Sequence, residues 1–316
     1  MALVPSTGTR GARIAGWGAA LPDEVLSNDE LAPQLDLPPG WIEDRSGIRE
    51  RRLGGTTAGL AGAACRAALE RSGCRAADVD MLVLATMSPD QTCPASSARV
   101  QHELGLRCGA FDVNAACTGF LYALVSALGF VATGCDRVLV VGSETMRRIV
   151  DWDDRDTAIL FGDGAGAVLL EATDGESAFL GWTLRSDGAL AELITCELGG
   201  TMSMVGREVF RVAVRLLVDS VRATLEAAGL TPKEITLLVP HQANIRILEM
   251  ASTRLGIPME RVATVLQHSG NTSAASIPLA LAEAADAGRL QRGDHVLLAG
   301  FGAGMTSGSL LVRWDT

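Results

Sequence analysis

A cysteine stands where a long apolar helix is predicted to begin. The stretch FDVNAACTGFLYALVSALGF, residues 111–130, places Cys117 among small residues, and its later apolar residues recur at roughly helical spacing. Unpaired N–H groups and the helix dipole at a helix N-terminus favour the thiolate, which is the nucleophilic form of cysteine. Cys117 is therefore a candidate for covalent catalysis, although a small buried cysteine with a packing role also fits this segment.

Two further candidates lie in the second half of the chain. His241 ends the apolar run in VPHQANIRI, and Asn271 lies in a Gly-Asn turn in HSGNTSAASIP. Ligands gather at strand ends in α/β folds, so both positions suit chemistry. Taken singly, His241 equally fits a hydrogen-bonded structural histidine, and Asn271 fits a turn or an N-cap.

An internal repeat brings the three candidates to one centre. LERSGCRAADVDMLVLA from Leu69 matches LEAAGLTPKEITLLVPH from Leu225 at an offset of 225 − 69 = 156, and CDRVLVVGSE matches GDHVLLAGFG at an offset of 158. Two halves of one architecture are predicted, each running helix, turn, strand, loop, buried helix, strand. At offset 156 Cys117 corresponds to Ser273, so the two segments that open apolar helices should be pseudo-symmetry mates.

The predicted strands and the boundary between the halves follow from the same pattern. Continuous apolar runs such as MLVLA, RVLVV, TLLV and HVLLA indicate strands covered on both faces, as in parallel or mixed α/β sheets. The polar stretch EATDGES is typical of a linker. We divide the chain into residues 1–172, which carry the nucleophile candidate, and 173–316, which carry His241 and Asn271.

Composition excludes several classes of function. The 316 residues are 48% hydrophobic and 20% charged, as in a globular protein, and the net charge of −10 argues against general nucleic-acid or anionic-membrane binding. No secretory signal or membrane span is predicted. The seven cysteines are odd in number and lack C-x-x-C spacing, which predicts a reducing cytoplasm, mostly buried thiols and no metal. The single lysine, Lys233, nearly excludes Schiff-base chemistry.

Together these residues resemble a known family. Cys117 in NAACTGF, His241 in PHQAN and Asn271 in GNTSAASIP resemble β-ketoacyl-acyl carrier protein synthase III, and GFGAGMTSGSLLVRW resembles its closing hairpin. The resemblance runs from about Ile14 to Trp314. It implies an α/β, thiolase-like fold of five layers, αβαβα, with two pseudo-symmetric halves, in a homodimer.

The resemblance implies a decarboxylative Claisen condensation that needs no cofactor. Cys117 would take the acyl group of an acyl-coenzyme A, and malonyl-acyl carrier protein would then lose carbon dioxide. His241 and Asn271 would donate hydrogen bonds to the enolate, while the backbone N–H groups of Cys117 and Ala303 would form an oxyanion hole. Asn271 indicates a synthase that initiates fatty acid or polyketide chains, since elongating synthases carry a second histidine and thiolases a second cysteine.

Binding residues carry over from the same resemblance. Trp41 and Arg155 match positions that sandwich the adenine of coenzyme A, and Arg45 matches a polar contact of the same loop. Arg246 and Arg254, on the helix after His241, suit an acidic carrier protein.

Further matches concern the acyl pocket. Phe161 and Phe301 match its walls, and Cys93 matches a phenylalanine that in several relatives closes the partner subunit's pocket. A thiol is much smaller than a benzyl group, so we expect butyryl, branched or longer primers to be preferred over acetyl. The segment from Asp187 to Met204 is shorter than usual in the family, which leaves the native acceptor open.

Three alternatives remain. An acyltransferase on the same fold that never decarboxylates is opposed by Asn271, and a non-catalytic partner subunit by Cys117. FGDGAGA, from Phe161, matches the G-x-G-x-x-A pattern of an NAD(P)-dependent oxidoreductase. The following residues read as a strand rather than the helix that would bind pyrophosphate.

Overall fold

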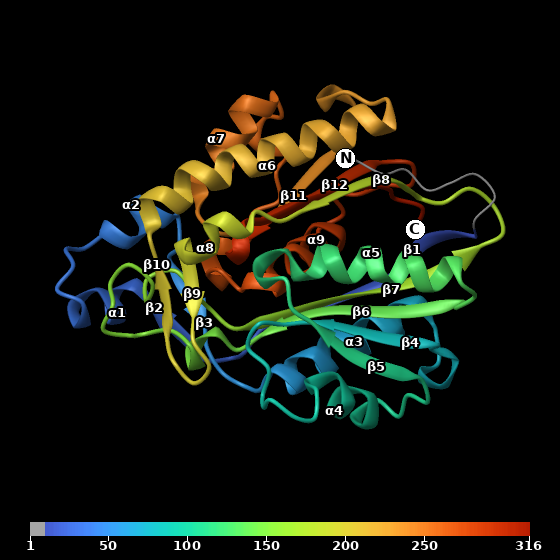
Figure 1. Cartoon of the computed structure of the whole chain (residues 1–316), viewed down its shortest axis with the longest axis horizontal. Helices are drawn as coiled ribbons and strands as arrows, with labels where there is room; N and C mark the ends of the chain where they lie inside the picture. Colours follow the sequence, from blue (N-terminus) through green and yellow to red (C-terminus); the bar gives the residue numbers. More distant parts are fainter. Residues whose placement is uncertain (1–9) are drawn as a thin grey trace.

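Two large sheets, drawn in Figure 1, form the frame of the protein, and the computed structural model describes residues 10–316. The first sheet has the order β1-β7-β6-β4-β5, in which β4 runs parallel to β5 and β6, and β7 runs antiparallel to β1 and β6. Its strands are β1 (Gly11–Ala20), β4 (Met81–Ala85), β5 (Gly109–Val113), β6 (Arg137–Glu144) and β7 (Gly164–Thr173). The second sheet, in the order β11-β12-β13-β8, comprises β8 (Phe179–Arg185), β11 (Leu237–Pro240), β12 (His295–Gly302) and β13 (Thr306–Arg313).

Helices cover both faces of each sheet. Between the sheets lie α5 (Gly119–Ala132) and α9 (Ser276–Asp286). The outer face of the first sheet is covered by α3 (Thr57–Ser72) and α4 (Ser96–Glu103), and that of the second by α6 (Gly206–Ala228) and α7 (Ile245–Leu255). Figure 1 shows the resulting five layers, with α6 and α7 at the top and α3 and α4 at the bottom. The expected αβαβα layering is confirmed.

The central helices are apolar on nearly every side because each faces a sheet. Phe120, Leu124, Ile277 and Leu281 are fully buried in one core that includes residues of both sheets. Complete burial of such a side chain contributes about 1.5–3 kcal/mol. This shared core fixes the start of α5 beside the start of α9, at the middle of the molecule.

The duplication differs by one residue from the register expected at this centre. Single 3-10 turns, Ala116–Thr118 and Ser273–Ala275, precede α5 and α9 at an offset of 157. The mate of Cys117 is therefore Ala274, and the expected pairing with Ser273 is wrong. The mates β4 and β11 begin 156 residues apart, whereas β6 and β12 begin 158 apart, so each connection in the second half adds one residue.

Smaller elements surround the carboxyl ends of the central strands. These are β2 (Val25–Ser27), α1 (Asn28–Gln34), α2 (Trp41–Ser46), β3 (Glu50–Arg52), β9 (Ile194–Cys196), β10 (Met202–Met204) and α8 (Leu266–Ser269). The β9–β10 pair is a short antiparallel hairpin and corresponds to the shortened segment seen in the sequence. It packs against the cluster that contains Leu31 and Ile42, so these elements together close one end of the molecule.

Several sequence expectations are decided by the fold. The FGDGAGA motif runs directly into strand β7 rather than into a helix. Of the seven cysteines only Cys65 is fully buried, while Cys93 and Cys196 are exposed, so the expectation of mostly buried thiols is wrong. Within residues 10–316 no helix has the length and apolarity needed to cross a membrane, and no group of three potential metal ligands occurs. The sequence predicts no secretory signal at the N-terminus. Residues 1–9 of that segment lie outside the described residues.

Candidate active site

One cavity brings the three candidate catalytic residues together. It encloses about 330 Å³ where the ends of the central strands meet the smaller elements. One wall carries the three candidates Cys117, His241 and Asn271. The remaining wall is largely apolar and includes Met87, Ile159, Phe161, Ile194, Met202, Met204, Val209, Phe210, Ile247 and Phe301.

The backbone at Cys117 forms a tight elbow. Ala116 has φ of 47°, a left-handed conformation that is uncommon for a residue with a side chain, and Asn114 Oδ1 accepts a hydrogen bond from its N–H at 3.0 Å. Gly302 packs against this elbow so closely that a Cβ would lie 2.8 Å from the nitrogen of Cys117. The close approach places the Gly302–Ala303 turn beside the Cys117 amide, where both N–H groups can face one oxygen.

Two effects raise the pKa of the Cys117 thiol, and two hydrogen bonds lower it. Burial raises its pKa to about 12, and the nearby carboxylate of Glu144 acts in the same direction. The hydroxyl of Ser273 donates to Sγ at 3.5 Å and opposes this rise. Desolvation thus opposes the thiolate that the start of the helix is expected to favour, and that expectation stays a prediction.

His241 follows β11 and is held as a neutral hydrogen-bond donor. It is 1% exposed, and burial lowers its pKa to about 3. Nδ1 lies 2.7 Å from Ser276 Oγ, which also accepts the N–H of Gln242 at 3.4 Å. The Ser276 hydroxyl can donate to Nδ1, and in that tautomer the ring proton lies on Nε2. Phe301 packs edge-on to the ring with 5.4 Å between centroids.

Asn271 is fixed on both its backbone and its side chain. Its N–H donates to the carbonyl of Leu160 at 2.8 Å, and its carbonyl accepts from Gly162 at 3.1 Å. The side-chain Oδ1 accepts the N–H of Ser273 at 2.9 Å, which leaves Nδ2 to donate into the cavity. A second elbow lies at Ser273, whose φ is also 47°, before α9. Asn271 occupies in it the place that Asn114 occupies in the first.

Two of the three coenzyme A candidates lie at the mouth of the cavity, and the third lies outside its lining. Trp41 and Arg45 both line it, and the guanidinium of Arg45 lies 4.3 Å above the indole ring. Arg155 is exposed and lies outside the cavity lining, which instead includes Asp156. The structure thus stacks Arg45, rather than Arg155, on Trp41.

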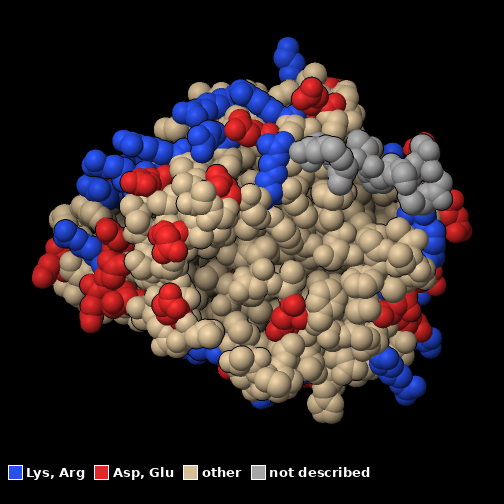
Figure 2. Space-filling view, in the orientation of Figure 1, with Lys and Arg blue, Asp and Glu red and all other residues tan. Residues whose placement is uncertain are grey.

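The carrier-protein candidates belong to a wider basic surface. Arg246 and Arg254 are exposed on α7, and Arg246 donates to the carbonyl of Asp44 at 2.8 Å. Sequence reasoning missed the exposed arginines at intervals of four on α6, which are Arg207, Arg211 and Arg215. Figure 2 shows the basic side chains gathered over α6 and its neighbours, although the whole chain is acidic. The i, i+4 spacing was the available signal.

The acyl-pocket candidates also divide. Phe161 and Phe301 line the cavity, whereas Cys93 is exposed and lies outside it. Sequence reasoning missed three methionines of the lining, which are Met87, Met202 and Met204. Unbranched methionine side chains adapt to irregular ligands, so this wall suits acyl groups of several shapes.

Comparison with known proteins identifies the family. Residues 111–188 match the family model for 3-oxoacyl-[acyl-carrier-protein (ACP)] synthase III, and residues 225–314 match its C-terminal model. The β-ketoacyl-[acyl-carrier-protein] synthase III of Sinorhizobium medicae (strain WSM419) is 47% identical over 318 residues, covering 95% of this chain and 98% of the relative.

Solved structures agree with the sequence comparison. The 3-oxoacyl-[acyl-carrier-protein] synthase III of Aquifex aeolicus VF5 superposes with a TM-score of 0.94 at 42% identity, covering 96% of this chain and 100% of the other. The priming β-ketosynthase of the R1128 polyketide pathway superposes with a TM-score of 0.92 at 35% identity, covering 99% of this chain and 98% of the other. Such identity over nearly the full length leaves one assignment, and the chain belongs to the β-ketoacyl-[acyl-carrier-protein] synthase III family, with its thiolase fold.

Proposed function

We propose that this enzyme joins an acyl group from acyl-coenzyme A to malonyl-acyl carrier protein with loss of carbon dioxide. The observation that carries the proposal is the convergence of Cys117, His241 and Asn271 on one cavity with an apolar wall. The relatives named β-ketoacyl-[acyl-carrier-protein] synthase III and the priming β-ketosynthase support the same reaction. The product would begin a fatty acid or polyketide chain.

In the first half-reaction Cys117 becomes acylated. Its sulfur attacks the thioester carbonyl, and the oxygen develops negative charge beside the N–H groups of Cys117 and Ala303. The intermediate collapses as the carbon–sulfur bond to coenzyme A breaks. Because the pKa of the Cys117 thiol is raised to about 12, the proton leaves Cys117 during this step and ends on the sulfur of coenzyme A.

In the second half-reaction the malonyl thioester loses carbon dioxide. The electrons of the broken carbon–carbon bond form an enolate, whose oxygen accepts hydrogen bonds from His241 Nε2 and Asn271 Nδ2. A neutral donor that stays protonated suits this role, and the lowered pKa of His241 keeps it neutral. The enolate carbon attacks the acyl carbonyl and expels the Cys117 thiolate, which takes a proton from solvent.

Partners are assigned from the surface around the cavity mouth. We assign the Trp41–Arg45 stack to the adenine of coenzyme A, with Arg155 reaching it only after a side-chain movement, and the arginines of α6 and α7 to an acidic carrier protein. We also propose a homodimer in which the exposed Cys93 closes the partner subunit's acyl pocket. Seven free thiols suit a reducing cytoplasm.

Intact-mass analysis tests the proposal directly. The enzyme is incubated with acetyl-, butyryl- and branched acyl-coenzyme A, and the acylated residue is mapped by peptide mass. Malonyl-acyl carrier protein is then added, and carbon dioxide and the β-ketoacyl product are measured. Acylation of Cys117 followed by product formation is expected. Acylation at Cys93 or Cys196 would refute the assignment.

The same experiment separates the acyltransferase alternative. An acyltransferase would pass the acyl group to an acceptor without release of carbon dioxide. Asn271→Ala distinguishes the two, because loss of one oxyanion donor lowers a decarboxylation rate about 100- to 1,000-fold. If Asn271→Ala condenses at the wild-type rate, the decarboxylative mechanism is wrong.

A further inference from the structure

The second elbow of the duplication contains a fully buried carboxylate that the catalytic steps above do not use. Glu144 ends β6 and is 0% exposed. One of its oxygens accepts the N–H of Ala274 at 3.3 Å, across to the start of α9. Ala274 is the pseudo-symmetry mate of Cys117, so this bond involves the amide that corresponds to the proposed oxyanion donor.

The residue at the equivalent strand end of the other half is a glycine. The strands β6 and β12 correspond at an offset of 158, which pairs Glu144 with Gly302. At the first elbow Gly302 has no side chain, and its backbone packs directly against the Cys117 amide. At the second elbow the side chain of Glu144 places a carboxylate oxygen beside the Ala274 amide. Its oxygen therefore stands where, at Cys117, the substrate oxyanion would stand.

The rest of the Glu144 site is made of hydrogen-bond donors from the loop after β4. The hydroxyl of Thr86 donates at 2.9 Å, the N–H groups of Met87 and Ser88 at 3.1 Å and 3.0 Å, and the hydroxyl of Ser88 at 2.5 Å. Successive N–H groups of this kind form an anion-binding nest. Burial raises the pKa of Glu144, while these donors favour its charged form.

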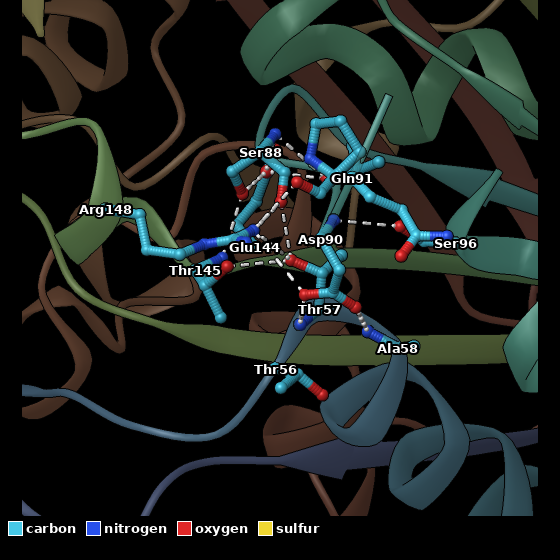
Figure 3. Close-up of polar contacts among 12 residues, drawn as sticks. Thr56, Thr57, Ala58, Ser88, Asp90, Gln91, Ser96, Glu144, Thr145 and Arg148 are labelled. Carbon is cyan, nitrogen blue, oxygen red and sulfur yellow. Dashed lines mark hydrogen bonds and ion pairs between the residues drawn. The ribbon is translucent and has the colours of Figure 1, made fainter. Parts of the chain in front are cut away.

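The network extends from this loop to the start of α3, as Figure 3 shows. Arg148 donates to the carbonyl of Ser88 at 2.5 Å and pairs with Asp90 at 3.5 Å. Asp90 in turn accepts the N–H groups of Thr57 and Ala58 at 2.9 Å and 2.8 Å. The carboxylate of Glu144 therefore joins the end of β6, the loop after β4 and the start of α9. The loop after β4 carries Met87, which lines the cavity.

We propose that Glu144 is a positioning residue whose carboxylate acts as an internal oxyanion, filling the second elbow and so fixing Asn271 and Met87 for the condensation step. The proposal rests on the proposed function, because it takes the Cys117 amide as an oxyanion donor. Asn271 lies in the same Asx turn as Ser273 and Ala274, so a shift at Ala274 moves its side chain. Misplacement of about 1 Å in such a group can lower a rate about 100-fold.

Removal and replacement of the carboxylate test this role. In Glu144→Ala we expect condensation to fall about 100-fold, with a smaller fall in acylation of Cys117. Sodium formate should enter the vacated site, raise the thermal unfolding midpoint of this variant and restore part of its condensation rate. Wild type, the surface variant Glu103→Ala and the catalytic variant Asn271→Ala, at equal ionic strength with sodium chloride as reference, should gain nothing from formate.

Opposite outcomes would overturn the proposal. Equal stabilisation of all four proteins by formate would show that no anion site was vacated. If Glu144→Ala does not fold without formate, purification with and without formate gives the same comparison. Glu144→Gln is the second variant, because its amide fills the space but turns N–H groups toward donors. Condensation by Glu144→Gln at the wild-type rate would refute the role. The formate-dependent shift requires no condensing activity, so it is separable from a failure of the proposed function.

Discussion

Substitution of Ser276 by alanine should slow condensation while leaving acylation intact. The Ser276 hydroxyl is the partner of His241 Nδ1 at 2.7 Å and is 0% exposed, so no solvent replaces it readily. Without it, Nδ1 loses the partner that, in the proposed mechanism, keeps the ring proton on Nε2 for donation to the enolate. A buried hydrogen bond of this kind is worth about 0.5–1.5 kcal/mol.

That free energy converts to a specific kinetic effect. Since about 1.36 kcal/mol corresponds to a tenfold change in rate, Ser276→Ala should slow condensation about 2- to 13-fold. Removal of the whole donor in His241→Ala should cost about 100- to 1,000-fold. The smaller effect is expected because the ring stays in place against Phe301.

The assay separates the two half-reactions. The enzyme is first acylated and freed of coenzyme A, and product formation is then followed after addition of malonyl-acyl carrier protein. Ser273→Ala is the matched control, because this equally buried serine contacts Cys117 Sγ instead of His241. Ser273→Ala should slow acylation more than condensation. If both variants slow the same half-reaction equally, the tautomer argument is wrong.

Four further outcomes are expected. Gly302→Ala should reduce acylation at least about 100-fold, because its Cβ would lie 2.8 Å from the Cys117 nitrogen; near-normal acylation would place the oxyanion hole elsewhere. Alkylation of Cys117 by iodoacetamide should keep rising from pH 7 to 10, since its pKa is raised to about 12, and a plateau below pH 8 would contradict this. Arg246→Glu should weaken use of malonyl-acyl carrier protein more than acylation by acyl-coenzyme A, most at low salt, and equal losses would indicate a damaged fold. Cys93→Phe should shift the ratio of acylation rates from longer acyl groups toward acetyl, and an unchanged ratio would show that Cys93 does not limit the pocket.

The duplicated fold and the convergence of the three candidate residues on one cavity could be predicted from the sequence. The apolar segments after Cys117 and Asn271 specify buried helices wherever they occur, and the repeat implies that two such helices meet. His241 at the end of a strand follows from the same repeat. These features depend on residue type and short-range periodicity, so the amino-acid sequence determined them.

Only the tertiary structure decided the pKa of Cys117, the register in which the two halves correspond and the contacts of Glu144. Burial of Cys117, which no local pattern predicts, is the largest influence on the pKa of its thiol. The extra residues of the second half lie within connections, so the offset of 156 taken from the strands missed that Ala274 is the mate of Cys117, although Asn114 and Asn271 share the correct register. The contact of Glu144 with Ala274 joins residues 130 positions apart. Such contacts arise only when the two halves pack around one core, because no local pattern encodes which buried carboxylate meets which amide.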